Sequence, residues 1–219
     1  MAETANNETI QEESLNDEQK GVLSNLKSII DDALDNLQDK FKRPDVHIMS
    51  EGDFEWRLAR QLDIELRRKK NKLNNFSVHT QVTWLNEGEP DCNKAVDDKN
   101  RIVDILILDM TKFKPIKGEE GKNSKKGSQY NGISFAIELK FLRPDTSVNN
   151  SEIDNDFAKR KSLEDKSWLY IVPLIDDSKG GYKDKEETIK GKYDIVAKGR
   201  NDIFYMPLII HPSVESKER

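Results

Sequence analysis

The sequence predicts an α/β fold in which helices pack on the faces of a β-sheet. Two segments with helical periodicity precede a series of strand-like segments, and a third helical segment lies between two of the strands. This alternation of helical and strand periods is typical of a layered α/β domain. A chain of 219 residues is long enough for one domain of ordinary size with a buried core.

The composition argues against a membrane or a secreted protein. Charged residues make up 35% of the chain, and no stretch approaches the roughly 18 apolar residues that a membrane span needs. The acidic N-terminus lacks the basic start and the apolar stretch of a secretory signal, so we expect a cytoplasmic protein. Cys92 is the single cysteine, which excludes an internal disulfide and a cysteine-rich zinc site.

Charge is distributed unevenly along the chain. Residues 1–40 carry ten acidic and three basic side chains, whereas residues 41–219 carry 31 acidic and 33 basic ones. The body of the protein is therefore weakly basic although the whole chain has a net charge of −5. This excess is compatible with a phosphate-bearing partner but is too small to indicate one by itself.

The N-terminal region divides into two parts. Residues 1–15 are predicted to be a disordered acidic arm, and residues 16–44 to be an amphipathic helix that Pro44 closes. The apolar residues of this helix recur at steps of three and four: Leu23, Leu26, Ile30, Leu34, Leu37 and Phe41. The stripe either packs on its own domain or, through residues 16–41, contacts a second copy of the chain or a partner protein.

A second helix is predicted to begin after Ser50, which is a suitable N-cap. Its buried face is marked by five residues: Phe54, Leu58, Gln61, Leu62 and Leu66. Glu51 and Glu55 border that face. The helix ends in the basic run 67–72, which either complements the helix dipole or contacts phosphate.

Two strands are predicted to follow as a hairpin. Residues 76–85 and 101–110 are rich in β-branched and aromatic residues, and the polar residues 86–100 connect them. Residues 111–131 contain six lysines and almost nothing apolar after Ile116. We expect this segment to be a long mobile loop.

The remaining chain is predicted to add three strands and one helix. The strands are residues 133–142, 168–176 and 202–210, and the helix is residues 151–163. A connection rich in glycine and lysine precedes the last strand.

Three charges stand inside these apolar strands. An acid followed two positions later by lysine occurs at six places besides Glu138 and Lys140, so the pattern alone carries no meaning. Alternation, however, puts Glu138 and Lys140 on the same side of a strand that is apolar on both faces, where unpaired charges are costly. An internal Glu–Lys pair is the simplest explanation, but it leaves unexplained Asp104, in the equally apolar strand RIVDILIL.

Asp104 and Glu138 converge if their strands are neighbours. Two close carboxylates repel each other unless a proton or a cation lies between them. Magnesium is held by one or two carboxylates together with other oxygen ligands, so these two acids and a backbone carbonyl between Glu138 and Lys140 would suffice. Lys140 could then orient a water molecule or neutralise charge in a phosphoryl transition state.

These residues resemble the core of the PD-(D/E)XK nucleases, the restriction-endonuclease-like superfamily. The resemblance rests on Asp104 followed after a long gap by Glu138-Leu139-Lys140, and it covers roughly residues 46–176. It includes the acid-bearing helix SEGDFEWRLARQL before the hairpin and the helix NDFAKRKSL after the motif. It departs from the family pattern at Val103, where the family name has proline, and in the 33 residues that separate Asp104 from Glu138.

The resemblance implies a nuclease-like domain over residues 45–219 with a restriction-endonuclease-like fold. This fold is a central mixed β-sheet flanked by helices, to which the N-terminal helix is an addition. The implied function is magnesium-dependent hydrolysis of phosphodiester bonds by metal-activated water, with DNA as the expected substrate and Mn²⁺ as a possible substitute for Mg²⁺. The alternative is a catalytically silent nuclease-fold protein that acts as a nucleic-acid-binding or protein–protein adaptor subunit.

The resemblance also implies a role for each site residue. Asp104 and Glu138 would be the metal ligands, with the carbonyl of Leu139 as a further ligand, and Lys140 would be the base that orients the water. Glu51 would be the helical acid that completes the site. Glu55, one turn later on the same side, is the alternative to Glu51.

Backbone contacts to nucleic acid are expected from basic residues of the lysine-rich loop and of the predicted helix 151–163. The candidates are Lys125, Lys126, Arg160 and Lys161. Such contacts contribute affinity without reading the base sequence. For any single one of these side chains, a solvated surface position is the simpler interpretation.

Overall fold

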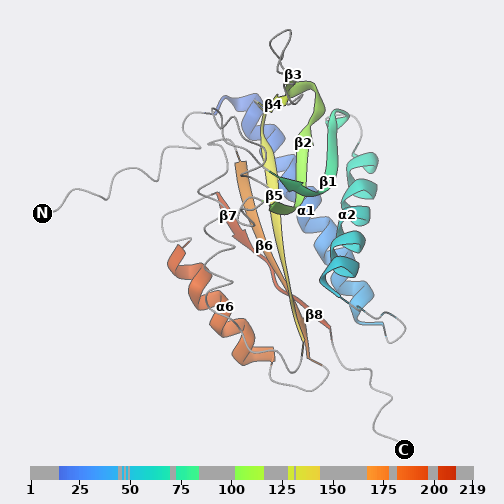
Figure 1. Ribbon diagram of the computed structural model, residues 1–219, viewed down its shortest axis with the longest axis vertical. Helices are drawn as coiled ribbons and strands as arrows, with labels where there is room; N and C mark the ends of the chain where they lie inside the picture. Colours follow the sequence, from blue (N-terminus) through green and yellow to red (C-terminus); the bar gives the residue numbers. More distant parts are fainter. Residues whose placement is uncertain are drawn as a thin grey trace, which may run out of the picture.

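The protein has a central mixed β-sheet with helices on both faces (Figure 1). The computed structural model describes residues 15–43, 46, 48, 50–69, 73–83, 102–115, 128–130, 132–143, 167–177, 182–196 and 202–210. Its elements are α1 (Asp17–Phe41), α2 (Glu51–Arg68), β1 (Phe76–Thr83), β2 (Ile102–Asp109), the 3₁₀ turn η2 (Met110–Lys112), β3 (Phe113–Pro115), β4 (Ser128–Tyr130), β5 (Ser134–Leu142), β6 (Ser167–Asp176), α6 (Tyr182–Val196), β7 (Ile203–Tyr205) and β8 (Leu208–Ile210). The predicted α/β class is confirmed.

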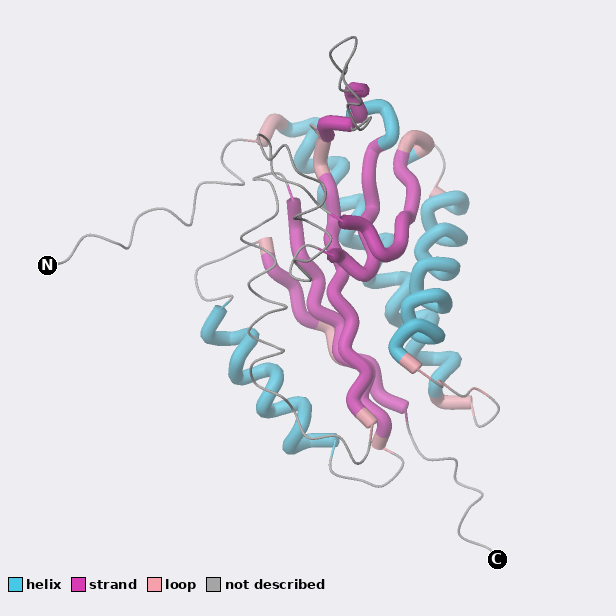
Figure 2. Tube along the Cα trace, viewed as in Figure 1, coloured by secondary structure: helices cyan, strands magenta, loops and turns pink. Residues whose placement is uncertain are grey.

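The sheet combines an antiparallel half with a parallel half. Its strand order is β1-β2-β5-β6-β7, and β8 also pairs with β6. The pairs β1–β2 and β2–β5 are antiparallel, which confirms the predicted hairpin, whereas β6 pairs in parallel with β5, β7 and β8. Helix α6 forms the crossover between β6 and β7, because two parallel strands cannot be joined by a tight turn (Figure 2).

Each face of the sheet has its own apolar core. Phe135 and Ile137 of β5 face α1 and α2, and so does Trp168 of β6. Ala136 of β5 and Leu169 of β6 face the opposite side, where Ile189 of α6 covers them. β5 is thus buried on both faces along most of its length, as its continuous apolar sequence predicts.

Helix α1 packs on its own domain. Asn16 caps it through a capping box, because the Asn16 side chain accepts the Gln19 N–H and the Gln19 side chain accepts the Asn16 N–H. All six residues of the predicted stripe are buried, and the Gln38 side chain bonds both the N–H and the carbonyl of Ile209 in β8. The apolar stripe that a second copy would need is therefore covered by the same chain. Residues 1–14 lie outside the described residues.

Helix α2 begins and packs as predicted. Ser50 Oγ accepts the Asp53 N–H at 3.2 Å, and the five residues of the predicted face are all buried. The α1–α2 interface also contains a buried acid, Glu65, which accepts hydrogen bonds from Asn36 and Gln61 and pairs with Arg68. These bonds fix α2 against α1, since a buried carboxylate requires partners.

The predicted loop 111–131 is partly ordered into strands. Its ends form the antiparallel pair β3–β4, and Tyr130 fastens this pair to the main sheet. The Tyr130 hydroxyl accepts the Asp109 N–H at 3.0 Å and donates to the Ile133 carbonyl at 2.6 Å. Residues 116–127 lie outside the described residues, as do residues 84–100 and the predicted helix 151–163.

The C-terminal part departs from prediction in two ways. The predicted strand 202–210 is split into β7 and β8 by Met206 and Pro207, because proline has no N–H to donate to a ladder. Where the structure has helix α6, the sequence predicts only a connection rich in glycine and lysine. Ile189 is the only buried residue among the described side chains of α6, and Gly191 lies in the interior of the helix. The sequence of α6 therefore has a weak helical periodicity. Neither α6 nor another described helix is long and apolar enough to cross a membrane.

We predict that Gly132→Ala destabilises the protein. A Cβ at this position would meet the Tyr130 hydroxyl, and would lie 2.6 Å from Tyr130 Cζ and 2.9 Å from Lys112 Cβ. The two hydrogen bonds of Tyr130 prevent the ring from moving aside, so we expect a loss of about 1–3 kcal/mol in the free energy of unfolding, measured in urea.

Gly21→Ala is the matched control, because a Cβ at Gly21 in α1 meets nothing within 4 Å. This variant should gain up to about 1 kcal/mol through helix propensity. Equal effects of the two substitutions would contradict the packing described for Tyr130.

Candidate active site

The pairing of β2 with β5 ends in the middle of β5 and leaves an open edge. The ladder runs from Leu108 opposite Ser134 to Ile105 opposite Ile137. β5 itself continues to Leu142 and remains paired with β6 over this whole length. Beyond Ile137, the edge of β5 that faces β2 must therefore find hydrogen-bond partners other than a strand.

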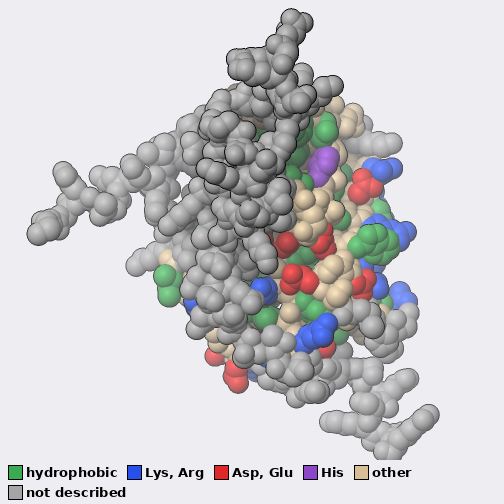
Figure 3. Space-filling view, viewed as in Figure 1, with side chains coloured by type: hydrophobic (Ala, Val, Ile, Leu, Met, Phe, Trp, Pro, Cys, Tyr) green, Lys and Arg blue, Asp and Glu red, His purple; other side chains and the backbone are tan. Residues whose placement is uncertain are grey.

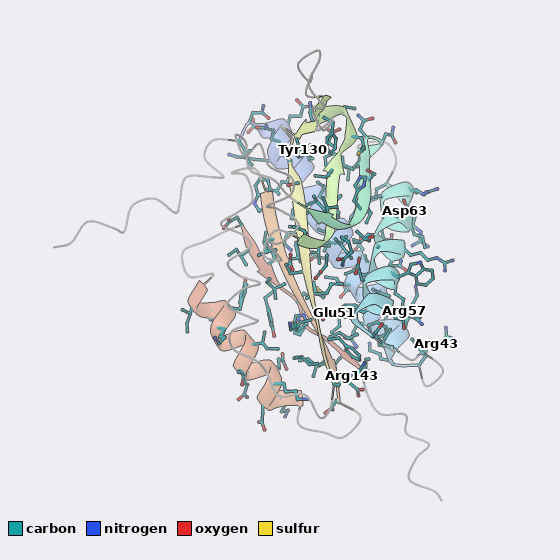
Figure 4. The ribbon with its side chains drawn as sticks, viewed as in Figure 1. Arg43, Glu51, Arg57, Asp63, Tyr130 and Arg143 are labelled. Atoms are coloured by element: carbon teal, nitrogen blue, oxygen red, sulfur yellow. The ribbon has the colours of Figure 1, made fainter. Side chains whose placement is uncertain are left out.

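Two carboxylates supply these partners. Asp104 Oδ2 accepts the Leu139 N–H at 2.8 Å, and Glu51 Oε2 accepts the Phe141 N–H at 3.0 Å. Figure 4 shows Glu51 between α2 and β5. The N–H and C=O of one residue point to the same edge of a strand, so the Leu139 carbonyl lies on this edge between the two capped amides. The structure thus brings Asp104, Leu139 and Glu51 together.

Glu138 and Lys140 flank Leu139 and share one face of β5. The same face carries Ala136 and Leu142, which belong to the core beneath α6. Glu138 is only 1% exposed, whereas Lys140 is half-buried. A carboxylate buried to this degree requires compensating charge or hydrogen bonds. The predicted common side of the two residues follows from the alternation along β5.

Glu55 of α2 is a further acid near Asp104 and Glu51, on the side of β1. Burial raises the pKa of Glu55, a hydrogen bond from Gln81 opposes this rise, and the negative charges of Asp104 and Glu51 raise the pKa further. Figure 3 shows Asp and Glu side chains gathered near the centre of the face drawn there. Glu51 touches the motif strand, while Glu55 is electrostatically coupled to Asp104, so both helical acids adjoin the site.

Gln81 is a site residue that the sequence did not reveal. Its side-chain Nε2 donates to Glu55 Oε2 at 2.8 Å and so links β1 to α2. Nothing in the strand sequence FSVHTQVTWL distinguishes this glutamine from any other polar residue on a solvent-facing position. Its role is visible only once α2 is packed beside β1.

The metal ligands that the sequence predicts are all oxygen atoms. Within the described residues, no group of three or more His, Cys, Asp or Glu side chains is arranged to hold a metal ion. The candidate ligands are instead two carboxylates, Asp104 and Glu138, and the carbonyl of Leu139. Such a set suits a hard cation such as Mg²⁺ or Mn²⁺, which takes oxygen ligands and retains several waters.

The four candidate nucleic-acid contacts, Lys125, Lys126, Arg160 and Lys161, lie outside the described residues.

No family model, curated protein or solved structure matches this chain. A functional assignment therefore depends on the chemistry of the residues around the open edge of β5.

We predict that Glu55→Gln raises the Tm at neutral pH. The folded state holds the Glu55 pKa above its ordinary value of 4.5, so the folded protein binds this proton more tightly than the unfolded chain. Stability is consequently lost as the pH rises through the folded-state pKa. Glutamine removes the charge and keeps an oxygen acceptor for Gln81, so the Tm should rise by a few degrees at pH 7.

The gain should shrink as the pH falls below 4.5 and disappear at about pH 3, where Glu55 is protonated in both states. Calorimetry of the variant and the wild type across this pH range measures the effect. Glu187→Gln is the control, since Glu187 is an exposed carboxylate of α6 on the other side of the sheet. A Tm gain for Glu55→Gln that does not change with pH would contradict the electrostatic explanation.

Proposed function

We propose that the protein is a metal-dependent nuclease that hydrolyses phosphodiester bonds, with DNA as its substrate. The observation that carries this proposal is the 2.8 Å hydrogen bond from the Leu139 N–H to Asp104 Oδ2. It brings Asp104 of β2 directly onto the Glu138-Leu139-Lys140 segment of β5. Asp104 and Leu139, which are 35 positions apart in the chain, thereby meet where β2 leaves β5, and this contact supports the site that the PD-(D/E)XK resemblance implies.

A restriction-endonuclease-like fold is part of this proposal. An acid-bearing helix, α2, precedes the antiparallel strands β1, β2 and β5, and β6 then joins β5 in parallel. This order supports the proposal as far as the acid-bearing helix and the hairpin are concerned, while the helix NDFAKRKSL of the resemblance lies outside the described residues. The candidate site lies at the junction of the antiparallel and parallel halves, where the pairing of β2 with β5 ends.

The acids around the open edge favour a divalent cation as the partner. Asp104, Glu138 and the Leu139 carbonyl would hold it. When bound, Mg²⁺ would act as a Lewis acid toward the phosphate and lower the pKa of a coordinated water. Its charge would also offset the negative charges of Asp104 and Glu51, which add to the effect of burial in raising the Glu55 pKa.

The remaining residues have separate tasks in this proposal. Lys140 shares the face of Glu138, where its ammonium group would orient the attacking water and balance the negative charge that develops on the phosphate. Glu51 holds the Phe141 N–H and so fixes the segment of β5 that carries the motif. Glu55 supplies additional negative charge beside Asp104.

We predict metal-dependent cleavage that requires Asp104 and Lys140. Purified protein should cut plasmid or linear DNA in Mg²⁺ or Mn²⁺ and not in EDTA. Asp104→Asn keeps an oxygen that can accept the Leu139 N–H but removes the charge, and Lys140→Met keeps the length of the side chain. Each should lower the cleavage rate by at least about 100-fold.

Asp63→Asn is the matched control, because Asp63 lies on α2 in an exposed pair with Arg67. It should cut DNA at the wild-type rate. RNA and single-stranded DNA belong in the same assay, since cleavage of RNA alone would overturn the substrate proposed here. Cleavage that persists in Asp104→Asn and Lys140→Met would overturn the site.

The catalytically silent alternative has one observation in its favour. Asp104 and Glu51 already act as caps for backbone N–H groups, and structural caps need no cation. If capping is their whole role, Mg²⁺ will leave the Tm of the wild type unchanged. A Mg²⁺-dependent rise in Tm that Asp104→Asn abolishes would instead support the metal site, because a ligand that binds only the folded state stabilises it.

A further inference from the structure

Gln81 has an unusual backbone conformation in the middle of a strand. Its φ of 52° is the only positive value among the described residues other than glycine. This left-handed region is unfavourable for a residue with a Cβ, and bulky residues persist there only where the surrounding structure imposes it. A strained residue in β1 therefore requires a structural or a functional reason.

The conformation coincides with a gap in the β1–β2 ladder opposite Asp104. Thr80 pairs with Ile105 and Val82 pairs with Val103, but the position between them, Gln81 opposite Asp104, makes no pair. The register is the same on both sides of the gap, so no residue has been inserted. The ladder is interrupted only at this position, where the residue of β2 is Asp104, a candidate metal ligand.

The gap is accompanied by a change in the direction of β2. Ile105 belongs to the core beneath α1 and α2, whereas Val103 belongs to the core beneath α6. Residues two apart in a regular strand face the same side, so the strand turns between them, at Asp104. This turn allows the Asp104 carboxylate to lie at the edge of β5, where it accepts the Leu139 N–H.

The side chain of Gln81 makes the second connection. Its amide donates to Glu55 Oε2 at 2.8 Å, and Glu55 in turn interacts with the charge of Asp104. Glycine would adopt the left-handed conformation more easily, but it has no amide with which to hold Glu55. Asparagine also tolerates this conformation, but its side chain is one methylene shorter.

We propose that Gln81 is a positioning residue of the candidate site: its left-handed backbone turns Asp104 toward β5, and its amide holds Glu55 beside Asp104. The purpose of this positioning rests on the proposed function. The arrangement itself is a property of the chain without metal or substrate, so part of the test is independent of the nuclease assignment.

Two substitutions separate the backbone role from the side-chain role. Gln81→Val disfavours the left-handed region, because valine is β-branched, and removes the amide as well. Gln81→Gly permits that region and removes only the amide. Thr80→Val is the matched control, since Thr80 is the exposed neighbour in β1 and pairs regularly with Ile105.

Amide hydrogen exchange at Leu139 measures the first role. Gln81→Val should accelerate this exchange by about 10-fold or more, because Asp104 is drawn away from β5. Gln81→Gly and Thr80→Val should leave it at the wild-type value. The Val172 amide of the central strand β6 serves as the internal control, because it reports opening of the whole sheet.

Mn²⁺ affinity, measured by the electron paramagnetic resonance of the free ion, tests the second role. Gln81→Gly should weaken binding by about 10-fold, which is typical for the loss of an outer partner of a metal site. The same substitution in a Glu55→Gln background should have little further effect, because Gln81 acts by holding the negative charge of Glu55, and Glu55→Gln has already removed that charge. Thr80→Val should bind like the wild type.

The outcomes distinguish this inference from the proposed function. Unchanged Leu139 exchange in Gln81→Val would overturn the positioning role, even in a protein that binds Mn²⁺ and cuts DNA. Wild-type Mn²⁺ affinity in Gln81→Gly would overturn the role of the amide. A wild type that binds no Mn²⁺ would overturn the metal site itself, while Leu139 exchange would still decide whether Gln81 positions Asp104.

Discussion

The candidate site depends on the backbone amides of β5 beyond Ile137, which must find acceptors after β2 has turned away. A buried N–H without a partner is rare in folded proteins because its desolvation is not compensated. The chain meets this requirement with the side chains of Asp104 and Glu51 rather than with another strand. The choice of carboxylates as caps concentrates negative charge along one edge of the sheet.

This concentration connects stability with chemistry. Each cap is favourable as a hydrogen bond to a charged acceptor. Burial raises the pKa of Glu55, however, and the negative charges of both caps raise it further. The buried Glu138 on the adjoining face of β5 adds a further acid. An arrangement of this kind lowers the stability of the protein, and in the proposed function a bound cation would offset the repulsion.

The rest of the fold holds the acids in this unfavourable arrangement. Helix α2 carries Glu51 and Glu55, and its position is set by the apolar face that packs on the sheet and by the Glu65 network at the α1 interface. Lys69, at the end of α2, bonds both Ser28 and Asp32 of α1. Because α1 is itself tied to β8 through Gln38, the two helices and the sheet form a continuous support for the site.

The sequence by itself determined the α/β class, both N-terminal helices with their buried faces, the β1–β2 hairpin and the apolar strands with their three internal charges. These features are encoded in local periodicity, which short-range geometry converts into helices and strands. It did not determine β3 and β4, the break between β7 and β8, or α6, whose weak apolar periodicity gives little signal.

Only the tertiary structure decided how the candidate site is assembled. The sequence could say only that Asp104 and Glu138 converge if their strands are neighbours, and the meeting of Asp104 with Leu139 depends on where β2 leaves β5. The positioning role of Gln81 depends on its left-handed backbone conformation, which no intrinsic propensity of glutamine predicts. Contacts between residues far apart in the chain are set by the packing of whole elements, and local sequence does not encode that packing.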